Sequence, residues 1–263
     1  MNSFLTKLEK KWAQEKFVCV GLDIDSSKLP EGINSQFEFN KTIIDATHDL
    51  VCAYKPQSAF YEAGGSRGWE ELEKTVEYIK TKYPDIPVII DAKRGDIGST
   101  NQGYIEAFFN KMDCDAITLH PYLGKESIQP FLDLPDKGII ILVKTSNPGA
   151  GEFQDLIVDG KPLYQVVAQR VASEWNKNGN CAVVVGATYP EELKKVREIV
   201  GEMPILIPGI GAQGGDLEAV IKNGINSKGN GIIINSSRGI IYAQSPRGAT
   251  LKLNEDILKC LKS

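Results

Sequence analysis

The 263-residue sequence lacks several features that would point to a membrane or nucleic-acid protein. It has no apolar run of roughly 18 residues, the length that a membrane-spanning helix needs. It has no basic run or stripe, and its formal net charge is −4, so we expect neither a membrane nor a nucleic acid as a partner. The amino-terminal stretch 1–16 has no apolar core of the secretory type, and its spacing predicts an amphipathic helix instead.

Cysteine and histidine are scarce and scattered. The five cysteines stand singly, with no C-x-x-C pair, which argues against a disulfide framework or a zinc site and favours a reducing cytoplasm. The two histidines, His48 and His120, are too far apart in the sequence to predict a histidine-rich metal site. His48 lies in a helical stretch, whereas His120 follows a predicted strand, where it either lines a site or makes a structural hydrogen bond.

What the sequence does contain is a series of eight short runs rich in β-branched residues. Most of these runs are continuously apolar rather than alternating, which is typical of parallel strands that are buried on both faces. The predicted strands are Phe17–Asp25, Val51–Gln57, Pro87–Lys93, Ala116–Pro121, Gly138–Ser146, Cys181–Ala187, Pro204–Ile210 and Gly231–Arg238.

Segments with helical periodicity fill the gaps between these runs. Eight strand–helix units in this length predict a (β/α)8 TIM barrel, a single domain over residues 1–263 with an additional N-terminal helix. A doubly wound sheet is the alternative. The longest irregular segment, Asn147–Lys161, is either a mobile lid or a passive surface loop. The clearest helical segments are Trp69–Tyr83, Leu163–Trp175, Pro190–Val200, Asp216–Asn223 and Asn254–Leu261.

The most informative motif is Asp-Ala-Lys-Arg-Gly-Asp at residues 91–96, directly after the apolar run 87–90. Because side chains alternate along a strand, we expect Asp91 and Lys93 to point the same way at its carboxyl end, with Asp96 just beyond. Two carboxylates beside one ammonium group hold a charged lysine in place and can repel an anionic substrate group. The alternative is a surface ion pair, which contributes only about 0–1 kcal/mol.

Other polar residues also gather at the ends of the predicted strands. In a barrel of this kind the active site lies at the carboxyl ends of the strands. Ionisable groups buried there are costly unless they are paired or functional. This concentration favours a functional role for Asp91, Lys93 and Asp96. The remaining strand-end residues are Asp23, Asp25, Lys55, His120, Lys144, Ser146 and Arg238.

Residues 209–214 match the glycine pattern G-x-G-x-x-G between a predicted strand and a predicted helix. A dinucleotide site is disfavoured, because the next strand ends in Asn-Ser-Ser-Arg at 235–238 instead of an acidic residue. The loops after the last two strands of a barrel commonly bind phosphate. We therefore predict that this loop and Arg238 hold one phosphate monoester. Glycines that serve only a tight turn are the alternative.

Together these motifs resemble the orotidine 5′-phosphate decarboxylase family, most closely its longer bacterial subfamily, sometimes called type 2. The resemblance runs from Val-Gly-Leu-Asp at 20–23 to Ser-Arg-Gly-Ile-Ile-Tyr at 237–242. It rests on the D-x-K-x-x-D signature within 91–100, on Lys-Thr-Ser-Asn-Pro-Gly at 144–149 and on the glycine-rich run 208–215. It implies decarboxylation of orotidine 5′-phosphate to UMP in pyrimidine biosynthesis, with no metal or organic cofactor.

The resemblance also implies a role for each matching residue. Lys93 would protonate C6 of the pyrimidine as carbon dioxide leaves, and Asp91 would lie beside the substrate carboxylate. Lys55 would complete an alternating Lys–Asp–Lys–Asp array with them. Asp96, Ile97 and Thr100 would reach into the active site of a partner subunit, which implies a homodimer. The substrate contacts would be Asp23 and Lys55 at the ribose, Ser146 at the pyrimidine, Gln213 and Arg238 at the phosphate, and Ser237.

Three other functions are compatible with parts of the sequence. A Mg²⁺-dependent keto-sugar-phosphate decarboxylase shares the D-x-K-x-x-D element, but the motifs at 145–149 and 212–215 argue against it. A Schiff-base aldolase would use Lys93 or Lys144 as its nucleophile. A nucleotide-binding protein without activity would bind UMP and leave orotidine 5′-phosphate unchanged.

Overall fold

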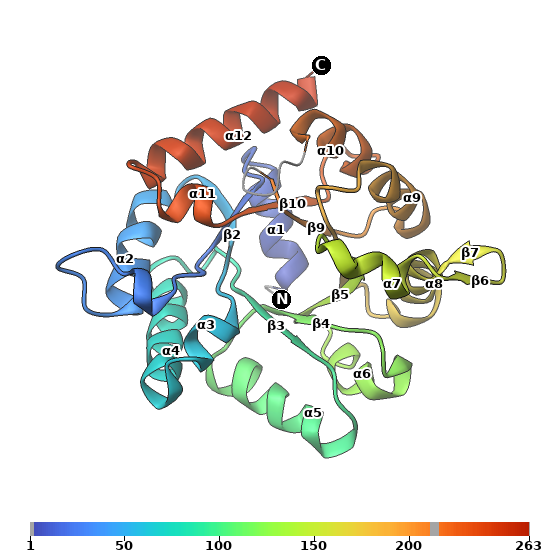
Figure 1. Cartoon of the computed structure of the whole chain (residues 1–263), viewed down its shortest axis with the longest axis horizontal. Helices are drawn as coiled ribbons and strands as arrows, with labels where there is room; N and C mark the ends of the chain where they lie inside the picture. Colours follow the sequence, from blue (N-terminus) through green and yellow to red (C-terminus); the bar gives the residue numbers. More distant parts are fainter. Residues whose placement is uncertain (1–2, 211–215, 263) are drawn as a thin grey trace.

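The computed structural model describes residues 3–210 and 216–262, and eight parallel strands within them form a barrel (Figure 1). These strands are β1 (Val18–Gly21), β2 (Val51–Lys55), β3 (Ile89–Arg94), β4 (Ala116–Leu119), β5 (Gly138–Lys144), β8 (Cys181–Val185), β9 (Ile205–Pro208) and β10 (Ile232–Ser236). Their hydrogen-bonded order is β2-β1-β10-β9-β8-β5-β4-β3. Bridges from Tyr54 to Val88 and from Gln57 to Asp91 join β2 to β3. The predicted TIM barrel is therefore confirmed.

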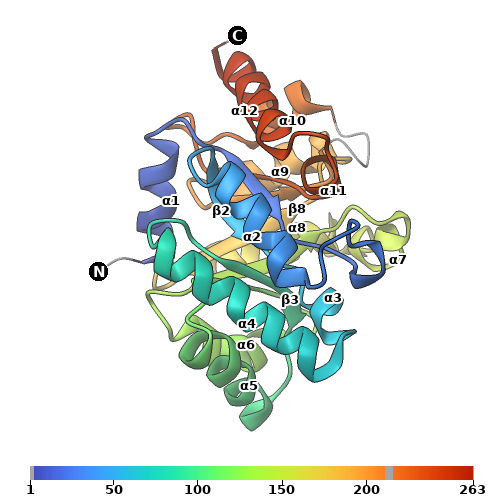
Figure 2. The same ribbon diagram turned by 90° about the vertical axis from the view of Figure 1, so that its left-hand side faces the viewer.

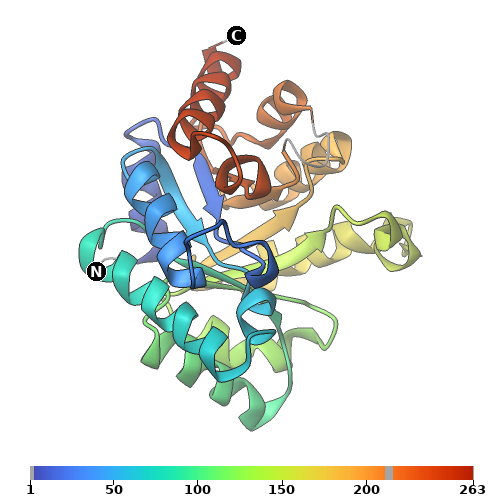
Figure 3. The ribbon, with the colours of Figure 1, turned by 60° about the vertical axis from the view of Figure 1, so that its left-hand side comes forward.

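Helices surround the strands on all sides (Figures 1 and 3). The α-helices are α1 (Phe4–Trp12), α2 (Gln36–Thr47), α3 (Ser58–Glu62), α4 (Gly65–Lys82), α5 (Gly98–Ile105), α6 (Gly124–Leu132), α7 (Gly151–Gln154), α8 (Leu163–Arg170), α9 (Pro190–Val200), α10 (Leu217–Gly224), α11 (Arg238–Ile241) and α12 (Pro246–Lys262). Short 3-10 turns form η1 (Ser26–Lys28) and η3 (Pro148–Ala150), and π-helical turns form η2 (Glu106–Lys111) and η4 (Val171–Trp175).

Several predicted boundaries were wrong. The first strand ends at Gly21 rather than Asp25, because the Asp25 carboxylate accepts the backbone N–H of Ser27 and caps η1. The last helix begins at Pro246, well before the predicted Asn254. Helix α9 has the predicted bounds, with proline at its start, where the missing N–H costs nothing.

The segment 147–161 is not irregular as predicted. It contains η3, α7 and a small antiparallel hairpin of β6 (Ile157–Val158) and β7 (Lys161–Pro162). Asp159 and Gly160 form its two-residue turn, and both have a positive φ. Asp-Gly is a strong signal for such a turn, so the sequence did contain the information.

Helix α1 covers the end of the barrel at which the strands begin, and α3, α7 and α11 lie toward the opposite end (Figure 2). Phe4, at the start of α1, packs on the first residue of β5, where a Cβ on Gly138 would lie only 2.2 Å from the phenyl ring. Lys7 Nζ lies 2.7 Å from Asp115 Oδ1 in a buried ion pair. Burial lowers the pKa of Lys7, and the neighbouring carboxylate of Asp115 only partly opposes this effect.

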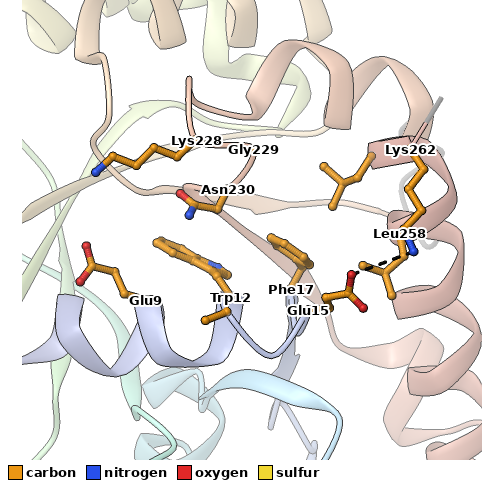
Figure 4. A pocket seen from close by; sticks show the side chains of 11 residues that line it. Glu9, Trp12, Glu15, Phe17, Lys228, Gly229, Asn230, Leu258 and Lys262 are labelled. Atoms are coloured by element: carbon orange, nitrogen blue, oxygen red, sulfur yellow. Dashed lines mark ion pairs between the residues drawn. The ribbon is translucent and has the colours of Figure 1, made fainter.

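A groove of about 400 Å³ lies at the same end of the barrel, between α1, α12 and the turn at 228–230 (Figure 4). Its floor is formed by Trp12 and Phe17, and the ion pair between Glu15 and Lys262 lies at its edge. Phe17 precedes β1 and the turn precedes β10, so this groove is remote from the carboxyl ends of the strands. Within 3–210 and 216–262, no helix is long and apolar enough to cross a bilayer.

Candidate active site

Three charged side chains from β2 and β3 form a continuous chain of ion pairs at the carboxyl end of the barrel. Lys55 Nζ lies 2.9 Å from Asp91 Oδ2, and Lys93 Nζ lies 2.6 Å from Asp91 Oδ1. The Lys55 side chain is buried, whereas that of Lys93 is 46% exposed. Asp91 is therefore held between a buried ammonium group and one that faces the open end of the barrel.

The charges in this chain stabilise one another. Burial opposes the charged form of Lys55, but the carboxylates of Asp23 and Asp91 outweigh it and raise the lysine pKa. Burial likewise disfavours ionised Asp91, but Lys55 and Lys93 reverse the effect and lower the pKa of this carboxyl. Asp91 is thus a carboxylate at neutral pH, in a position where a second anionic group would be repelled.

The backbone of Lys93 does not follow the regular alternation from which its position was predicted. Its φ is +47°, and the register of β3 against β4 is irregular between Ile90 and Arg94. A left-handed conformation is unfavourable for a residue with a side chain and often marks a functional position. The Lys93 N–H donates to Thr118 Oγ1 at 3.0 Å instead of to a backbone carbonyl of β4.

Asp96 lies apart from the chain of ion pairs. Its carboxylate accepts the N–H of Ile97 at 2.7 Å, and its own N–H donates to Asn101 Oδ1 at 2.9 Å. Among the described residues, Asp96 has no hydrogen bond or ion pair with Lys93. Ile97 is 58% exposed, and Thr100, in α5, is exposed as well. The second carboxylate of the motif is therefore not paired with the lysine of its own chain in the described residues.

Asp23 and Ser237 meet beside Lys55, although they are far apart in the sequence. The Ser237 hydroxyl donates to Asp23 Oδ2, while Asp23 Oδ1 is buried and has no hydrogen-bond partner within the described part of the chain. A Cβ on Gly21 would lie 2.0 Å from Ser237 Oγ, so glycine is needed there for this contact. A buried carboxylate oxygen without a partner is costly and marks a place for a donor from a ligand.

Two of the remaining predicted residues, Ser146 and Arg238, follow strands at the same carboxyl end of the barrel, which we call the rim. Ser146 follows β5 and packs against Gly186, where a Cβ would lie 2.7 Å from the serine Cβ. Arg238 begins α11 and is exposed. Gln213 and most of the predicted loop 209–214 lie outside the described residues. Gly209 is described, and its φ of +105° requires glycine.

The two residues without an assigned role, His120 and Lys144, have different surroundings. His120 lines a mainly apolar cavity of about 700 Å³ together with Tyr122 and Phe153. Lys144 is fully buried, pairs with Asp155 at 2.5 Å and lies over the ring of Tyr189 at 4.6 Å. Lys144 therefore anchors the segment after β5 to the barrel.

Sequence reasoning missed Thr118, which contacts both Asp91 and Lys93 of β3. Its signal was a hydroxyl in the otherwise apolar run 116–119. No group of three His, Cys, Asp or Glu side chains in the described ranges is placed to hold a metal ion.

Comparisons with known proteins agree on one family. Residues 16–253 match the family described as Orotidine 5′-phosphate decarboxylase / HUMPS family. A protein of Cellvibrio japonicus named orotidine 5′-phosphate decarboxylase is 49% identical over 97% of this chain and 98% of its own length. One of Cupriavidus metallidurans with the same name is 50% identical over 95% and 93%. The solved OMP decarboxylase of Leishmania donovani has a TM-score of 0.92 and 39% identity, covering 99% of this chain and all of its own. The chain therefore belongs to the orotidine 5′-phosphate decarboxylase / HUMPS family.

Proposed function

We propose that the chain decarboxylates orotidine 5′-phosphate to UMP, with Lys93 as the acid that protonates C6 of the pyrimidine. The observation that carries this proposal is the 2.6 Å contact between Lys93 Nζ and Asp91 Oδ1 on the rim of the barrel, in a chain of this family. Curated relatives about half identical to it bear the name of this enzyme. Loss of orotidine 5′-phosphate absorbance and release of carbon dioxide on mixing substrate with the protein test the activity.

The reaction needs a place for negative charge at C6. When the bond from C6 to the carboxylate breaks, its electron pair stays on C6 and carbon dioxide departs. The Lys93 ammonium is fixed by Asp91 where this charge develops, so it stabilises the charge without reorganising. A proton then passes from Lys93 Nζ to C6, which gives UMP, and the neutral amine recovers a proton from water. The like-charge contact between the substrate carboxylate and Asp91 ends at the same step.

We further propose that the enzyme is a homodimer with shared active sites. In this arrangement Asp96, Ile97 and Thr100 of one subunit complete the site of the other. Support comes from Asp96, which makes no hydrogen bond or ion pair with Lys93 among the described residues, and from the exposure of apolar side chains nearby. Ile97 is 58% exposed and Tyr122, after β4, is 81% exposed. Exposed apolar side chains in such a group are typical of an interface between subunits.

We also propose which residues contact the substrate. We assign Asp23 and Lys55 to the ribose hydroxyls, because the unpartnered Asp23 oxygen lies beside the buried lysine. Ser146 is assigned to the pyrimidine. Gln213 and Arg238 remain the proposed phosphate contacts, together with the loop 209–214. Ser237, whose hydroxyl donates to Asp23, remains a proposed substrate contact.

Replacing Arg238 by alanine should weaken phosphate binding more than it slows the chemical step. A charge-assisted hydrogen bond to phosphate is worth about 1.5–3 kcal/mol, so we expect KM to rise by roughly 10- to 100-fold. Arg238→Lys should recover part of the loss, because it keeps the charge but not the bidentate geometry. Steady-state kinetics check this, and an unchanged KM in Arg238→Ala would remove the arginine from the phosphate site.

We also infer that the 263 residues form one barrel domain that works in the cytoplasm without a metal or organic cofactor. The buried thiols support this location. Cys19, Cys52, Cys114 and Cys181 are all buried and form no disulfide. Burial raises the pKa of the Cys19 thiol to about 12. This thiol therefore stays protonated near neutral pH and is an inert core group.

A further inference from the structure

Thr118 occupies a position in the barrel where a hydroxyl group is unexpected. It lies in β4, whose other members are Ala116, Ile117 and Leu119, and it is 1% exposed. A buried hydroxyl is costly unless it is hydrogen-bonded. Valine has the same shape without the buried hydroxyl. The hydroxyl of Thr118 must therefore make hydrogen bonds that valine could not make.

The hydroxyl of Thr118 makes hydrogen bonds to two residues of the neighbouring strand, one as an acceptor and one as a donor. Its oxygen accepts the backbone N–H of Lys93 at 3.0 Å, and its proton is donated to Asp91 Oδ1 at 2.9 Å. It thus joins the backbone of the lysine to the carboxylate that binds the lysine side chain. The three groups form a closed ring of contacts with the 2.6 Å ion pair between Asp91 and Lys93.

The first of these bonds supports an unfavourable backbone. Lys93 has a φ of +47°, and the regular pairing of β3 with β4 is interrupted between Ile90 and Arg94. Thr118 Oγ1 is therefore the hydrogen-bond acceptor for the Lys93 N–H. Without that acceptor, the N–H would be left unsatisfied and the left-handed conformation would lose its support.

The second bond sets the orientation of the carboxylate. Asp91 Oδ1 accepts from both Thr118 and Lys93, and Oδ2 faces Lys55 at 2.9 Å. The two oxygens of a carboxylate are equivalent, so a half-turn changes nothing, but a smaller rotation would weaken both ion pairs. The Thr118 hydroxyl donates to the oxygen that faces Lys93 and so restrains the plane of the carboxylate.

We propose that Thr118 is a positioning residue for decarboxylation, whose hydroxyl fixes Lys93 and Asp91 in the geometry needed to protonate C6. The inference rests on the proposed role of Lys93. Thr118 acts through these two residues and does not contact the substrate in this proposal. Loss of its hydroxyl should therefore lower kcat and leave the affinity for UMP unchanged.

The test separates the contribution of the Thr118 hydroxyl from that of its methyl group. Thr118→Val keeps the shape and removes the hydroxyl, and Thr118→Ser keeps the hydroxyl and removes the methyl group. We expect kcat to fall on the order of 10- to 100-fold in Thr118→Val and to stay within about threefold in Thr118→Ser. The Kd for UMP should change by less than about threefold in both.

If Thr118→Val does not fold, Thr118→Ala and Thr118→Ser form a second pair, since both lack the methyl group and differ only in the hydroxyl. Thermal unfolding of each variant separates lost stability from lost chemistry. The inference is overturned if kcat is the same with and without the hydroxyl, or if kcat and UMP affinity fall together. If turnover requires Lys93 but not the Thr118 hydroxyl, only the positioning role of Thr118 is wrong. If turnover survives in Lys93→Ala, the proposed role of Lys93 as the acid is wrong.

Discussion

Lys93→Ala should lose nearly all decarboxylation, by about 10⁴-fold or more in kcat, while UMP still binds. A positioned general acid contributes about 10²–10⁴-fold, and a fixed charge where negative charge develops contributes about 10²–10³-fold more. The variant should fold, because Asp91 keeps its 2.9 Å contact with Lys55. Decarboxylation followed by absorbance, with UMP binding by calorimetry, measures both effects.

A matched control for this variant is Lys74→Ala. Lys74 is an exposed lysine in α4, so its removal changes the net charge equally and should leave kcat unchanged. Lys93→Ala that keeps more than about a tenth of the wild-type kcat would exclude the lysine as the essential acid.

Mixing two inactive variants is expected to restore activity if Asp96 serves the neighbouring subunit. Asp96→Asn and Lys93→Ala should each be nearly inactive as homodimers. In a mixed dimer, one site receives both substitutions and the other receives neither. After co-refolding at equal amounts, half of the dimers are mixed, so about a quarter of the sites should be wild type.

The control mixture is Asp91→Asn with Lys93→Ala. Both residues belong to the same chain's site, so every site in this mixture carries at least one substitution and no activity should return. Recovery of about a quarter of the wild-type activity in the first mixture alone supports the shared site. Equal recovery in both mixtures, or none in either, would contradict the assignment of Asp96 to the partner.

The barrel could be predicted because its determinants are local. Continuous apolar runs mark strands that are buried on both faces, and their regular alternation with helices leaves few topologies. The rim could be predicted for the same reason, since the carboxyl ends of parallel strands meet at one end of a barrel. Asp91 and Lys93 are two residues apart, so their contact could be predicted from the position of a single strand.

Other parts of the site depend on contacts that no local pattern contains. Ser237 and Asp23 are separated by most of the chain, and their hydrogen bond depends on the closure of β10 against β1. The left-handed φ of Lys93 depends on an acceptor in another strand, Thr118. Strand alternation gave the correct neighbours for Lys93 but the wrong backbone geometry.

The most direct test of the account is the turnover of orotidine 5′-phosphate by the wild-type protein after exhaustive treatment with EDTA. Absorbance reports loss of the substrate, and trapped carbon dioxide reports the bond that breaks. We expect stoichiometric formation of UMP and carbon dioxide at the same rate with EDTA and with added Mg²⁺. No turnover of this substrate, or turnover that disappears with EDTA and returns with Mg²⁺, would contradict it.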